Sequence, residues 1–311
     1  MPTIKKSVKF SGRGIHSGLP VNMVIKPSNT CGIFFKRVDL DSALIPARFE
    51  FVCDTKMRNT TIGKNDGAHV KTIEHLMAAL FMAGVDSAIV EINGPETPIL
   101  DGSAVDFYKH IIAAGVTGGK MQKIIVRRQV IVHARDVLRE LPFLIRIKIF
   151  FMNLLSGRRS DGFVKLSPSD NNSLNINATL VYREKIIGRQ NFSYSYDGTD
   201  ESVKIFVKNI ARARTFGKYS EWEYLKKHNM ARGADETHVI ALNYNGDGTL
   251  NNLFWPDEFV RHKIIDAIGD MFTSGGFIIG NLESYKGSHA MNNLILRKLF
   301  SDKNNYDIVD E

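Results

Sequence analysis

The sequence predicts an α+β protein of two domains, each with a β-sheet layered on helices. Short strand-like runs separated by Gly and Pro fill the first part of the chain, and helices follow them. The same order, strands and then helices, recurs after the glycine-rich stretch GVTGGK at residues 115–120. A chain of 311 residues is long for a single core, which also favours two domains. We therefore expect domains at 1–118 and 119–311, because linkers of this kind separate domains.

The elements of the first domain follow from hydrophobic periodicity and turn residues. Strands are predicted at Thr3–Phe10, Val21–Lys26, Ile33–Phe35 and 87–92. Helices are predicted at 71–80 and at Val105–Ala114, the latter ended by Gly115 as a C-cap.

The second domain repeats the pattern with longer helices. Strands are expected near 122–132, 162–167, 173–182 and 189–196, and helices near 201–212, Asp257–Phe272 and from His289 onward. An apparent insertion at about 137–160 interrupts it. This segment is apolar with interspersed basic residues, and its uncharged runs are too short to span a membrane. We expect a peripheral extension of the sheet, and its composition would also allow a transient contact with a membrane surface.

Composition limits the class of partner. The formal net charge of +8 suits anionic partners such as phosphorylated metabolites or acidic lipid headgroups. Basic residues do not alternate with aromatic ones in a stripe, so we expect no nucleic acid. Two cysteines predict no disulfide framework, and the N-terminus lacks the apolar region of a signal peptide. A cytoplasmic monomer without a transmembrane segment is the expectation.

The helix predicted at 71–80, KTIEHLMAAL, carries the polar neighbours Glu74 and His75. Counting from Ile73, apolar residues recur at the third, fourth, seventh and eighth positions, which defines a stripe facing the core. His75 lies roughly opposite that stripe among alanines, and Glu74 lies on its flank. Such a pair usually faces solvent, but the alanines would also suit a face that meets a second domain.

The helix at Asp257–Phe272 places His262 and Asp266 one turn apart, opposite its own apolar stripe. Two such side chains can bind one ion together, although pairs of this kind are also common on solvated helix faces. Gly269 lies on the same side. A glycine inside a helix costs up to about 1 kcal/mol relative to alanine, and it allows another segment to approach the backbone closely.

Catalytic zinc takes three protein ligands and a water molecule, and two histidines with one carboxylate are a common set. His262 and Asp266 leave one position, which His75 would fill if the two helices face each other across the domain interface. Glu74 points elsewhere, because neighbouring helix positions differ by about 100°. It would suit a general base acting on the water. The same ligands would also accept Fe(II) or Co(II).

Three other stretches suit hydrolysis, and each also has an ordinary structural explanation. His289 precedes a helix within YKGSHAMNN and suits a mobile acid, although a histidine at a helix end is the commoner case. Thr215 and Phe216 in ARARTFG offer a hydroxyl and a stacking ring, or are simply a strand end. Lys263 would neutralise an oxyanion or a phosphate, or would be solvated.

Six motifs taken together resemble one family. GIHSG, TIEHLMAAL, PILDGSA, ARTFG, FVRHKIIDAIGD and SHAMNN occur in an order that resembles the UDP-3-O-acyl-N-acetylglucosamine deacetylases, the zinc enzymes that commit bacteria to lipid A synthesis. The resemblance covers nearly the whole chain. It implies two α+β domains with the metal site in the cleft between them. It also implies hydrolysis of the N-acetyl group of UDP-3-O-(3-hydroxyacyl)-N-acetylglucosamine to a free amine and acetate.

The resemblance also implies roles for particular residues. The zinc ligands fall on His75, His262 and Asp266, the general base on Glu74, and the acid that protonates the leaving amine on His289.

Four further residues match supporting positions of that family. Thr215 and Lys263 match residues that stabilise the oxyanion and position the substrate. Phe216 matches a residue that contacts the substrate, and Asp270 matches the aspartate that orients the acidic histidine. Family inserts that build an acyl-chain passage are expected near 55–65 and 217–240.

Two departures and two alternatives accompany the resemblance. The family's usual Ser-Gly-His reads Gly287-Ser288-His289 here, which would shift that turn slightly, and the segment at 137–160 belongs to no family motif. A zinc amidohydrolase acting on another N-acylated substrate would share the same ligands. A non-catalytic protein with a structural metal is a further alternative, against which Glu74 and His289 argue, because a structural site needs four ligands and no base.

Overall fold

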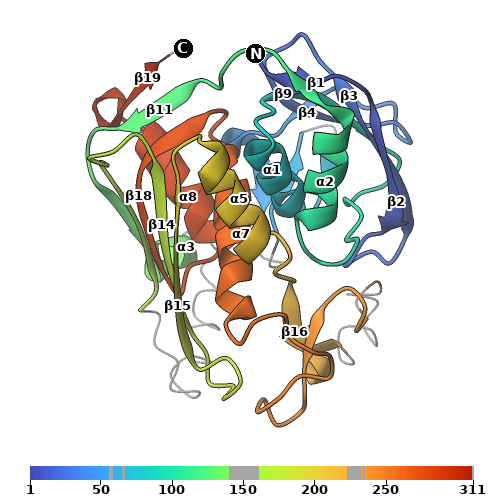
Figure 1. Cartoon of the computed structure of the whole chain (residues 1–311), viewed down its shortest axis with the longest axis vertical. Coiled ribbons are helices and arrows are strands. Elements are labelled where there is room, and N and C mark those ends of the chain that lie inside the picture. The colour runs from blue at the N-terminus through green and yellow to red at the C-terminus, as the bar shows by residue number, and fades with distance from the viewer. Residues whose placement is uncertain (56–58, 65–66, 140–160, 223–232, 234, 310–311) are drawn as a thin grey trace.

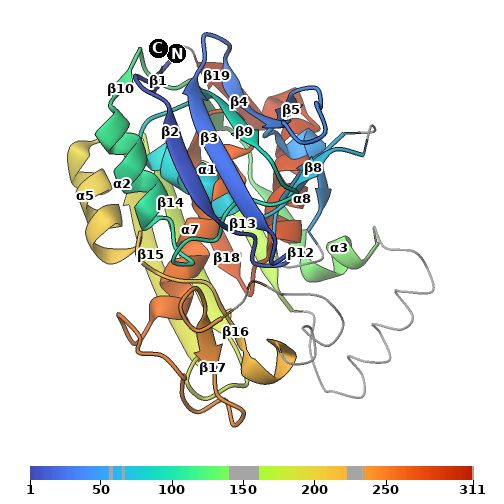
Figure 2. The same cartoon turned by 90° about the vertical axis from the view of Figure 1, so that its right-hand side faces the viewer.

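The computed structural model describes residues 1–55, 59–64, 67–139, 161–222, 233 and 235–309. Two large sheets form the outer layers, and helices fill the space between them (Figure 1). A view from the side of the first sheet shows β2 (Val8–Arg13) and β3 (Pro20–Pro27) in front of α1 (Glu74–Met82) (Figure 2). The α+β architecture expected from the sequence is confirmed, with sheets layered on helices in both halves of the chain.

The first sheet has seven strands, all within residues 3–117. Strand β9 (Ser87–Ile92) pairs antiparallel with β3 (Pro20–Pro27) and parallel with β4 (Gly32–Arg37). The other strands are β1 (Thr3–Ile4), β2 (Val8–Arg13), β5 (Ile45–Pro46) and β10 (Val116–Thr117). The strand predicted at Thr3–Phe10 is two strands, because β1 pairs with β9 and β10 whereas β2 pairs with β3.

The second sheet also has seven strands, all within residues 123–309. Its centre is β18 (Phe277–Tyr285), which pairs parallel with β11 and β14 and antiparallel with β13. The other strands are β11 (Lys123–Val126), β12 (Val130–His133), β13 (Phe163–Ser167), β14 (Leu174–Val181), β15 (Arg189–Tyr196) and β19 (Tyr306–Val309). The sequence analysis did not predict β18, whose first four residues are all buried and therefore show no alternation.

Two small sheets lie outside these layers. One contains β6 (Val52–Asp54), β7 (Thr61–Gly63) and β8 (His69–Val70), and the other pairs β16 (Phe216–Lys218) with β17 (Ile240–Leu242). Only β7 lies wholly inside a stretch where a family insert was expected, 55–65, whereas β16 and β17 lie at the two ends of the other, 217–240.

The helices agree closely with the sequence analysis. The described helices are α1 (Glu74–Met82), α2 (Val105–Ala114), α3 (Ala134–Arg139), α5 (Asp200–Asn209), α7 (Glu258–Phe272) and α8 (His289–Phe300), with 3-10 turns at Phe49–Phe51 and Lys303–Asn305. Gly115 ends α2 with a φ of 76°, as its C-cap position predicted. Helix α5 ends three residues earlier than the predicted range.

The expected insertion at 137–160 lies mostly outside the described residues, and α3 is the part of the chain that leads into it. Within the described part of the chain, no helix has both the length and the apolar character needed to cross a membrane.

Helix α1 joins the two halves of the molecule. All its residues are buried, including those on the face that the sequence placed opposite the core stripe. That face meets α7, the helix that carries His262 and Asp266. Phe81 of α1 packs its ring 5.3 Å from that of Phe272 on α7 and 5.8 Å from that of Phe277 on β18. A single hydrophobic core therefore continues from one sheet to the other.

Gly269 permits this contact. A β-carbon at Gly269 would lie 2.0 Å from the carbonyl oxygen of Glu74 and 3.0 Å from its α-carbon, closer than atoms can approach. The glycine in the middle of α7 is therefore required by the backbone of α1, and the close approach that its presence suggested is confirmed.

We expect Gly269→Ala to destabilise the fold by roughly 3 kcal/mol or more, at the upper end of what overpacking costs, because rigid backbone atoms must move apart. Chemical denaturation would measure the loss. Gly119→Ala is a matched control, since the nearest atom to a β-carbon there lies 3.8 Å away. Equal stability of the two variants would contradict the account.

Candidate metal centre and active site

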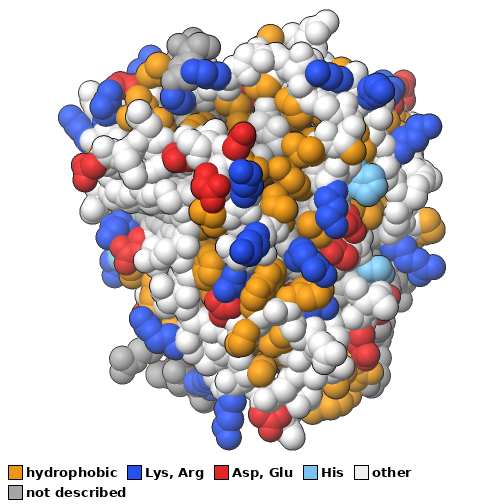
Figure 3. Space-filling view, in the orientation of Figure 1, with side chains coloured by type: hydrophobic (Ala, Val, Ile, Leu, Met, Phe, Trp, Pro, Cys, Tyr) orange, Lys and Arg blue, Asp and Glu red, His pale blue; other side chains and the backbone are white. Residues whose placement is uncertain are grey.

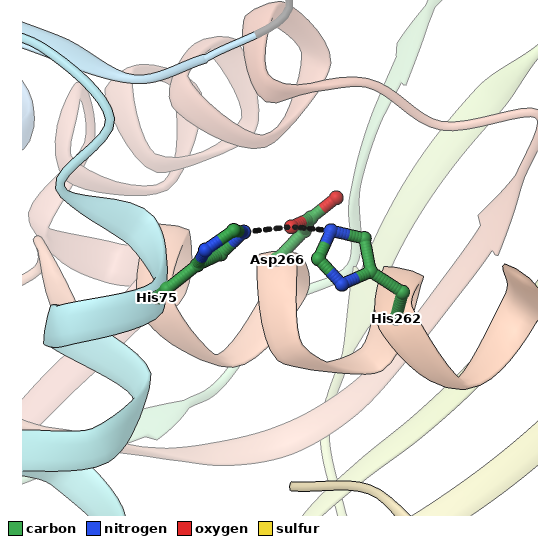
Figure 4. A group of neighbouring side chains, drawn as sticks. All are labelled: His75, His262 and Asp266. Carbon is green, nitrogen blue, oxygen red and sulfur yellow. Dashed lines mark ion pairs between the residues drawn. The ribbon is translucent and has the colours of Figure 1, made fainter. Parts of the chain in front are cut away.

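Three buried side chains converge where α1 meets α7 (Figure 4). His75 comes from α1, and His262 and Asp266 come from successive turns of α7. The Oδ1 atom of Asp266 lies 3.3 Å from Nε2 of His262 and 3.7 Å from Nε2 of His75. One donor atom from each residue falls within 4.8 Å of the other two, which is the spacing of ligands around one metal ion.

The chemistry of these atoms fits a metal ion. Asp266 Oδ1 is buried without a hydrogen-bond partner among the described residues, an unfavourable state for a carboxylate oxygen unless a cation completes it. Burial, reinforced by His262, lowers the pKa of His75 to about 3, and burial also lowers the pKa of His262. Both imidazoles are therefore neutral at pH 7 and can bind a metal through a nitrogen lone pair.

A backbone contact fixes the tautomer of His262. Its Nδ1 lies 3.0 Å from the carbonyl oxygen of Ala213, which can only accept, so Nδ1 carries the proton and donates it. Nε2 is left as the lone-pair atom, directed toward Asp266. Holding the far nitrogen of a ligand histidine in this way is typical of metal sites.

Lys263 lies beside the triad. Its Nζ donates to Oδ2 of Asp266 over 2.6 Å, and the same ammonium lies 5.8 Å from the centre of the Phe216 ring. Burial opposes ionisation of Asp266, but Lys263 and the neighbouring histidines outweigh it and hold the pKa of this carboxyl far below its usual range. Asp266 is therefore an anion, the form that binds a metal.

Glu74 sits next to the triad at the first position of α1 and is buried. Its Oε2 accepts a hydrogen bond of 3.0 Å from the backbone N–H of Thr60. Burial, aided by the nearby carboxylates Asp270 and Asp266, raises the pKa of Glu74 to about 8. Positive charge held by the triad would lower that pKa again, so the group is placed to exchange a proton near neutral pH.

His289 begins α8, which packs against α7, and it lies close to Asp266 and Asp270 of that helix. Its Nδ1 lies 2.7 Å from Oδ2 of Asp270, and its Nε2 lies 3.8 Å from Oδ2 of Asp266. Burial opposes protonation, but Asp270, Asp266 and Glu74 outweigh it and raise the pKa of His289 to about 9. His289 therefore carries a proton at pH 7, unlike the two histidines of the triad.

The turn before His289 accommodates the reordered Gly287-Ser288 pair. A β-carbon at Gly287 would lie 2.0 Å from Oγ of Ser284, so glycine leaves room for that hydroxyl where a larger residue would require it to rotate away. Ser288 has extended backbone angles, and its side chain caps α8 by accepting a hydrogen bond from the N–H of Met291. The order found in this chain therefore suits this turn.

A cavity of about 630 Å³ opens beside the triad. Eight of the nine site residues expected from the sequence line it: Glu74, His75, Thr215, Phe216, His262, Lys263, Asp266 and His289. The ninth, Asp270, lies behind His289 and reaches the cavity through it. The structure therefore brings together every residue that the sequence analysis selected.

The wall of the cavity is mixed in character. The stretch at 217–240, where an insert was expected, contributes apolar side chains such as Trp222 and Val239 as well as the charged Lys218 and Glu221. The lining also includes the ion pair of Lys286 Nζ with Asp161 Oδ1 at 2.6 Å. In the stretch at 55–65, the described residues do not line the cavity, so that part of the expected passage is not seen among them.

Thr215 and Phe216 are placed by backbone contacts. The N–H of Thr215 donates to the Gly102 carbonyl oxygen and its own carbonyl oxygen accepts from Ile240 N–H, each over 2.8 Å. The Phe216 ring lies 6.4 Å from that of His262. The PILDGSA and ARTFG motifs are therefore neighbours in space, and the first holds the backbone of the second at the site.

Sequence reasoning missed three residues that hold the site. Thr60 and Asn292 both donate to Asp270, over 2.6 and 2.9 Å. Glu96 accepts hydrogen bonds from the backbone N–H groups of His16 and Ser17 and so holds the GIHSG loop at the cavity. Spacing along the sequence gave no signal for these contacts, because each joins segments far apart in the chain.

The buried cluster contains two histidines and a carboxylate, and a further buried carboxyl group and a protonated histidine lie beside it. This arrangement is typical of metal-dependent hydrolases that use a water molecule and a general base. The chain belongs to the UDP-3-O-acyl N-acetylglycosamine deacetylase family, whose model matches residues 1–301. The resemblance drawn from the six motifs is thereby confirmed.

Two relatives illustrate the match. The chain is 35% identical over 309 residues to the UDP-3-O-acyl-N-acetylglucosamine deacetylase of a Nitratiruptor species, covering 99% of this chain and 93% of that protein. It is 34% identical over 312 residues to the enzyme of that name from Neisseria meningitidis serogroup A, covering 99% and 92%. The similarity thus extends over essentially the whole of each protein.

We expect the purified protein to bind one divalent metal ion per chain. His262→Ala should weaken metal affinity by more than roughly 100-fold, beyond what loss of an outer contact costs, because it removes a direct ligand. Metal analysis after dialysis against a weak chelator would measure this. His110→Ala is the control, since His110 is exposed on α2. Equal metal content in both variants would contradict the site.

Proposed function

We propose that this protein hydrolyses the N-acetyl group of a UDP-3-O-acyl-N-acetylglucosamine, giving a free amine and acetate in lipid A biosynthesis. The observation that carries the proposal is the buried cluster of His75, His262 and Asp266 beside a large cavity. Membership of a family named for this activity supports the choice of substrate.

We propose zinc as the ion, held by His75, His262 and Asp266, because imidazole and carboxylate ligands suit it. When bound, such an ion supplies Lewis acidity toward water and toward a carbonyl oxygen. The remaining chemistry belongs to the chain's own residues.

Glu74 acts as the general base in this proposal. Its carboxylate takes a proton from the attacking water as the oxygen forms a bond to the acetyl carbon. Burial and the Thr60 N–H leave it few alternative partners and fix its orientation.

His289 acts as the general acid. It is protonated at pH 7, and its Nδ1 proton is held by Asp270, so its Nε2 proton is the one available to the leaving nitrogen. Transfer of that proton as the carbon–nitrogen bond breaks releases a neutral amine rather than an unstable amide anion.

Lys263 and Thr215 stabilise the negative charge that develops on the carbonyl oxygen. Both line the cavity next to the triad, and Lys263 carries a full positive charge because Asp266, against the effect of burial, raises its pKa. A fixed cation in a site that excludes water is more effective than one in solution. Phe216, on the same wall, offers a ring for contact with the substrate.

The mixed cavity wall suits a substrate with an acyl chain and a diphosphate. Apolar residues from 217–240 provide a surface for the acyl chain, and Lys218 and Lys286 add basic groups to the same wall. The net charge of +8 favours an anionic substrate. On the face shown in Figure 3, basic side chains are spread widely, with hydrophobic ones gathered along the middle, rather than forming the continuous stripe that nucleic acid would require.

The proposal includes the expected organisation of the chain. We place the two domains at 1–118 and 119–311, since all strands of the first large sheet come from one range and all strands of the second from the other. The site then lies where the two domains meet. A monomer with a cytoplasmic location, as the sequence led us to expect, completes the proposal.

We expect Glu74→Gln to lower kcat by roughly 100- to 10,000-fold while leaving bound metal unchanged, because the amide cannot take a proton. Acetate release and metal content would be measured on the same sample. Glu91→Gln is the control, since Glu91 lies on β9 in a surface ion pair with Lys26. Turnover that survives in Glu74→Gln would exclude the base role.

Substrate choice separates this function from a general zinc amidohydrolase. We expect kcat/KM to fall at least about tenfold when the UDP group or the 3-O-acyl chain is removed, because both would contact the cavity. Equal turnover of simple N-acetylated sugars would favour the alternative. A series of acyl lengths would show how deep the apolar part of the cavity is.

A further inference from the structure

Thr60 occupies a place between the proposed base and the proposed acid. It precedes β7, is 2% exposed, and lies in the stretch at 55–65 that the sequence had associated with an acyl-chain insert. Its backbone N–H donates to Oε2 of Glu74 over 3.0 Å, and its hydroxyl donates to Oδ1 of Asp270 over 2.6 Å. Thr60 therefore contacts Glu74 directly, and it reaches His289 both through Asp270 and through its own hydroxyl oxygen, which lies 3.3 Å from Nδ1 of His289.

The backbone of Thr60 is itself held at the start of α1. Its carbonyl oxygen accepts a hydrogen bond of 3.3 Å from the N–H of Ile73, the residue before Glu74. The N–H and the carbonyl of Thr60 thus both bind the first turn of α1. Movement of Thr60 would shift Glu74 with it.

The hydroxyl of Thr60 completes the surroundings of Asp270. Oδ2 of Asp270 is shared by Nδ1 of His289 and the amide of Asn292, at 2.7 and 2.9 Å. Oδ1 receives the Thr60 hydroxyl. A hydroxyl has one proton to donate, and here it goes to the carboxylate, so the hydroxyl oxygen faces Nδ1 of His289, 3.3 Å away, as an acceptor. The orientation of Asp270, and hence of the His289 ring, depends on this arrangement.

We propose that Thr60 is a positioning residue for the deacetylation reaction: its backbone N–H positions Glu74, and its hydroxyl, bonded to Asp270 and in contact with Nδ1 of His289, positions His289. This inference rests on the proposed function. The base and the acid come from helices α1 and α8, which are far apart in sequence, and the position of Thr60 influences the orientation of both side chains. Precise placement of reacting groups lowers the barrier by reducing the motions that must be frozen in the transition state.

An isosteric substitution separates positioning from packing. Thr60→Val preserves the volume and the β-branch, so the core stays filled, but Asp270 loses its donor on Oδ1. Thr60→Ser keeps the hydroxyl and removes a methyl group. Thr61→Val is the matched control, because Thr61 is 3% exposed and its hydroxyl bonds to Asn59 Oδ1 rather than to the site.

The experiment measures acetate release from UDP-3-O-(3-hydroxyacyl)-N-acetylglucosamine, together with melting temperature and bound metal. We expect Thr60→Val to lower kcat by roughly 10- to 100-fold, with KM within about threefold and metal content unchanged, as loss of a hydrogen bond to a charged group predicts. Thr60→Ser should retain kcat within about threefold. Thr61→Val should lose similar thermal stability yet keep its kcat.

Three results would overturn the proposal: a kcat of Thr60→Val within about twofold of wild type, equal losses in Thr60→Ser and Thr60→Val, or an equal loss in Thr61→Val. If Thr60→Val does not fold, Thr60→Ala, which also removes the hydroxyl without adding bulk, carries the same expectation. An inactive wild-type protein would instead reject the proposed function, and with it this inference.

Discussion

The close contact between the backbones of α1 and α7 is the constraint on which the site depends. The two histidines and the aspartate of the triad come from these two helices, so the distance between helix axes sets the distance between ligands. Gly269 contributes no side chain where α1 passes, and any other residue would force the helices apart. Glycine destabilises a helix, but a larger side chain at this position would not allow the close helix contact on which the ligand geometry depends.

Several ionisable groups are buried around this contact, and they carry different charges because each has different neighbours. His75 has a pKa of about 3 because burial and a neighbouring imidazole disfavour its charge. His289, buried to the same degree, has a pKa of about 9 because carboxylates surround it. Environment alone therefore leaves one histidine neutral and the other protonated within a single site, as their proposed roles of metal ligand and proton donor require.

The sequence predicted the parts of the fold that depend on local patterns of residues. Amphipathic periodicity located α7 and α2, and the pairing of His262 with Asp266 follows from the helix repeat itself. Strand β18 escaped notice because a strand buried on both faces has no alternation to detect. The roles of Thr60 and Asn292 could not be predicted, since their contacts with Asp270 join positions up to 210 residues apart. These features were missed because tertiary packing determines them and the local sequence pattern does not.

The central position of β18 has a consequence for the order in which the chain matures during synthesis. Strands β11, β13 and β14 emerge from the ribosome long before their shared partner, which lies near the C-terminus. They must remain without it until β18 has been synthesised, with unpaired strand edges exposed, as is typical of folds with pairings between distant segments. His289 follows β18 in the chain, so the proposed acid emerges after the proposed base and all three proposed metal ligands.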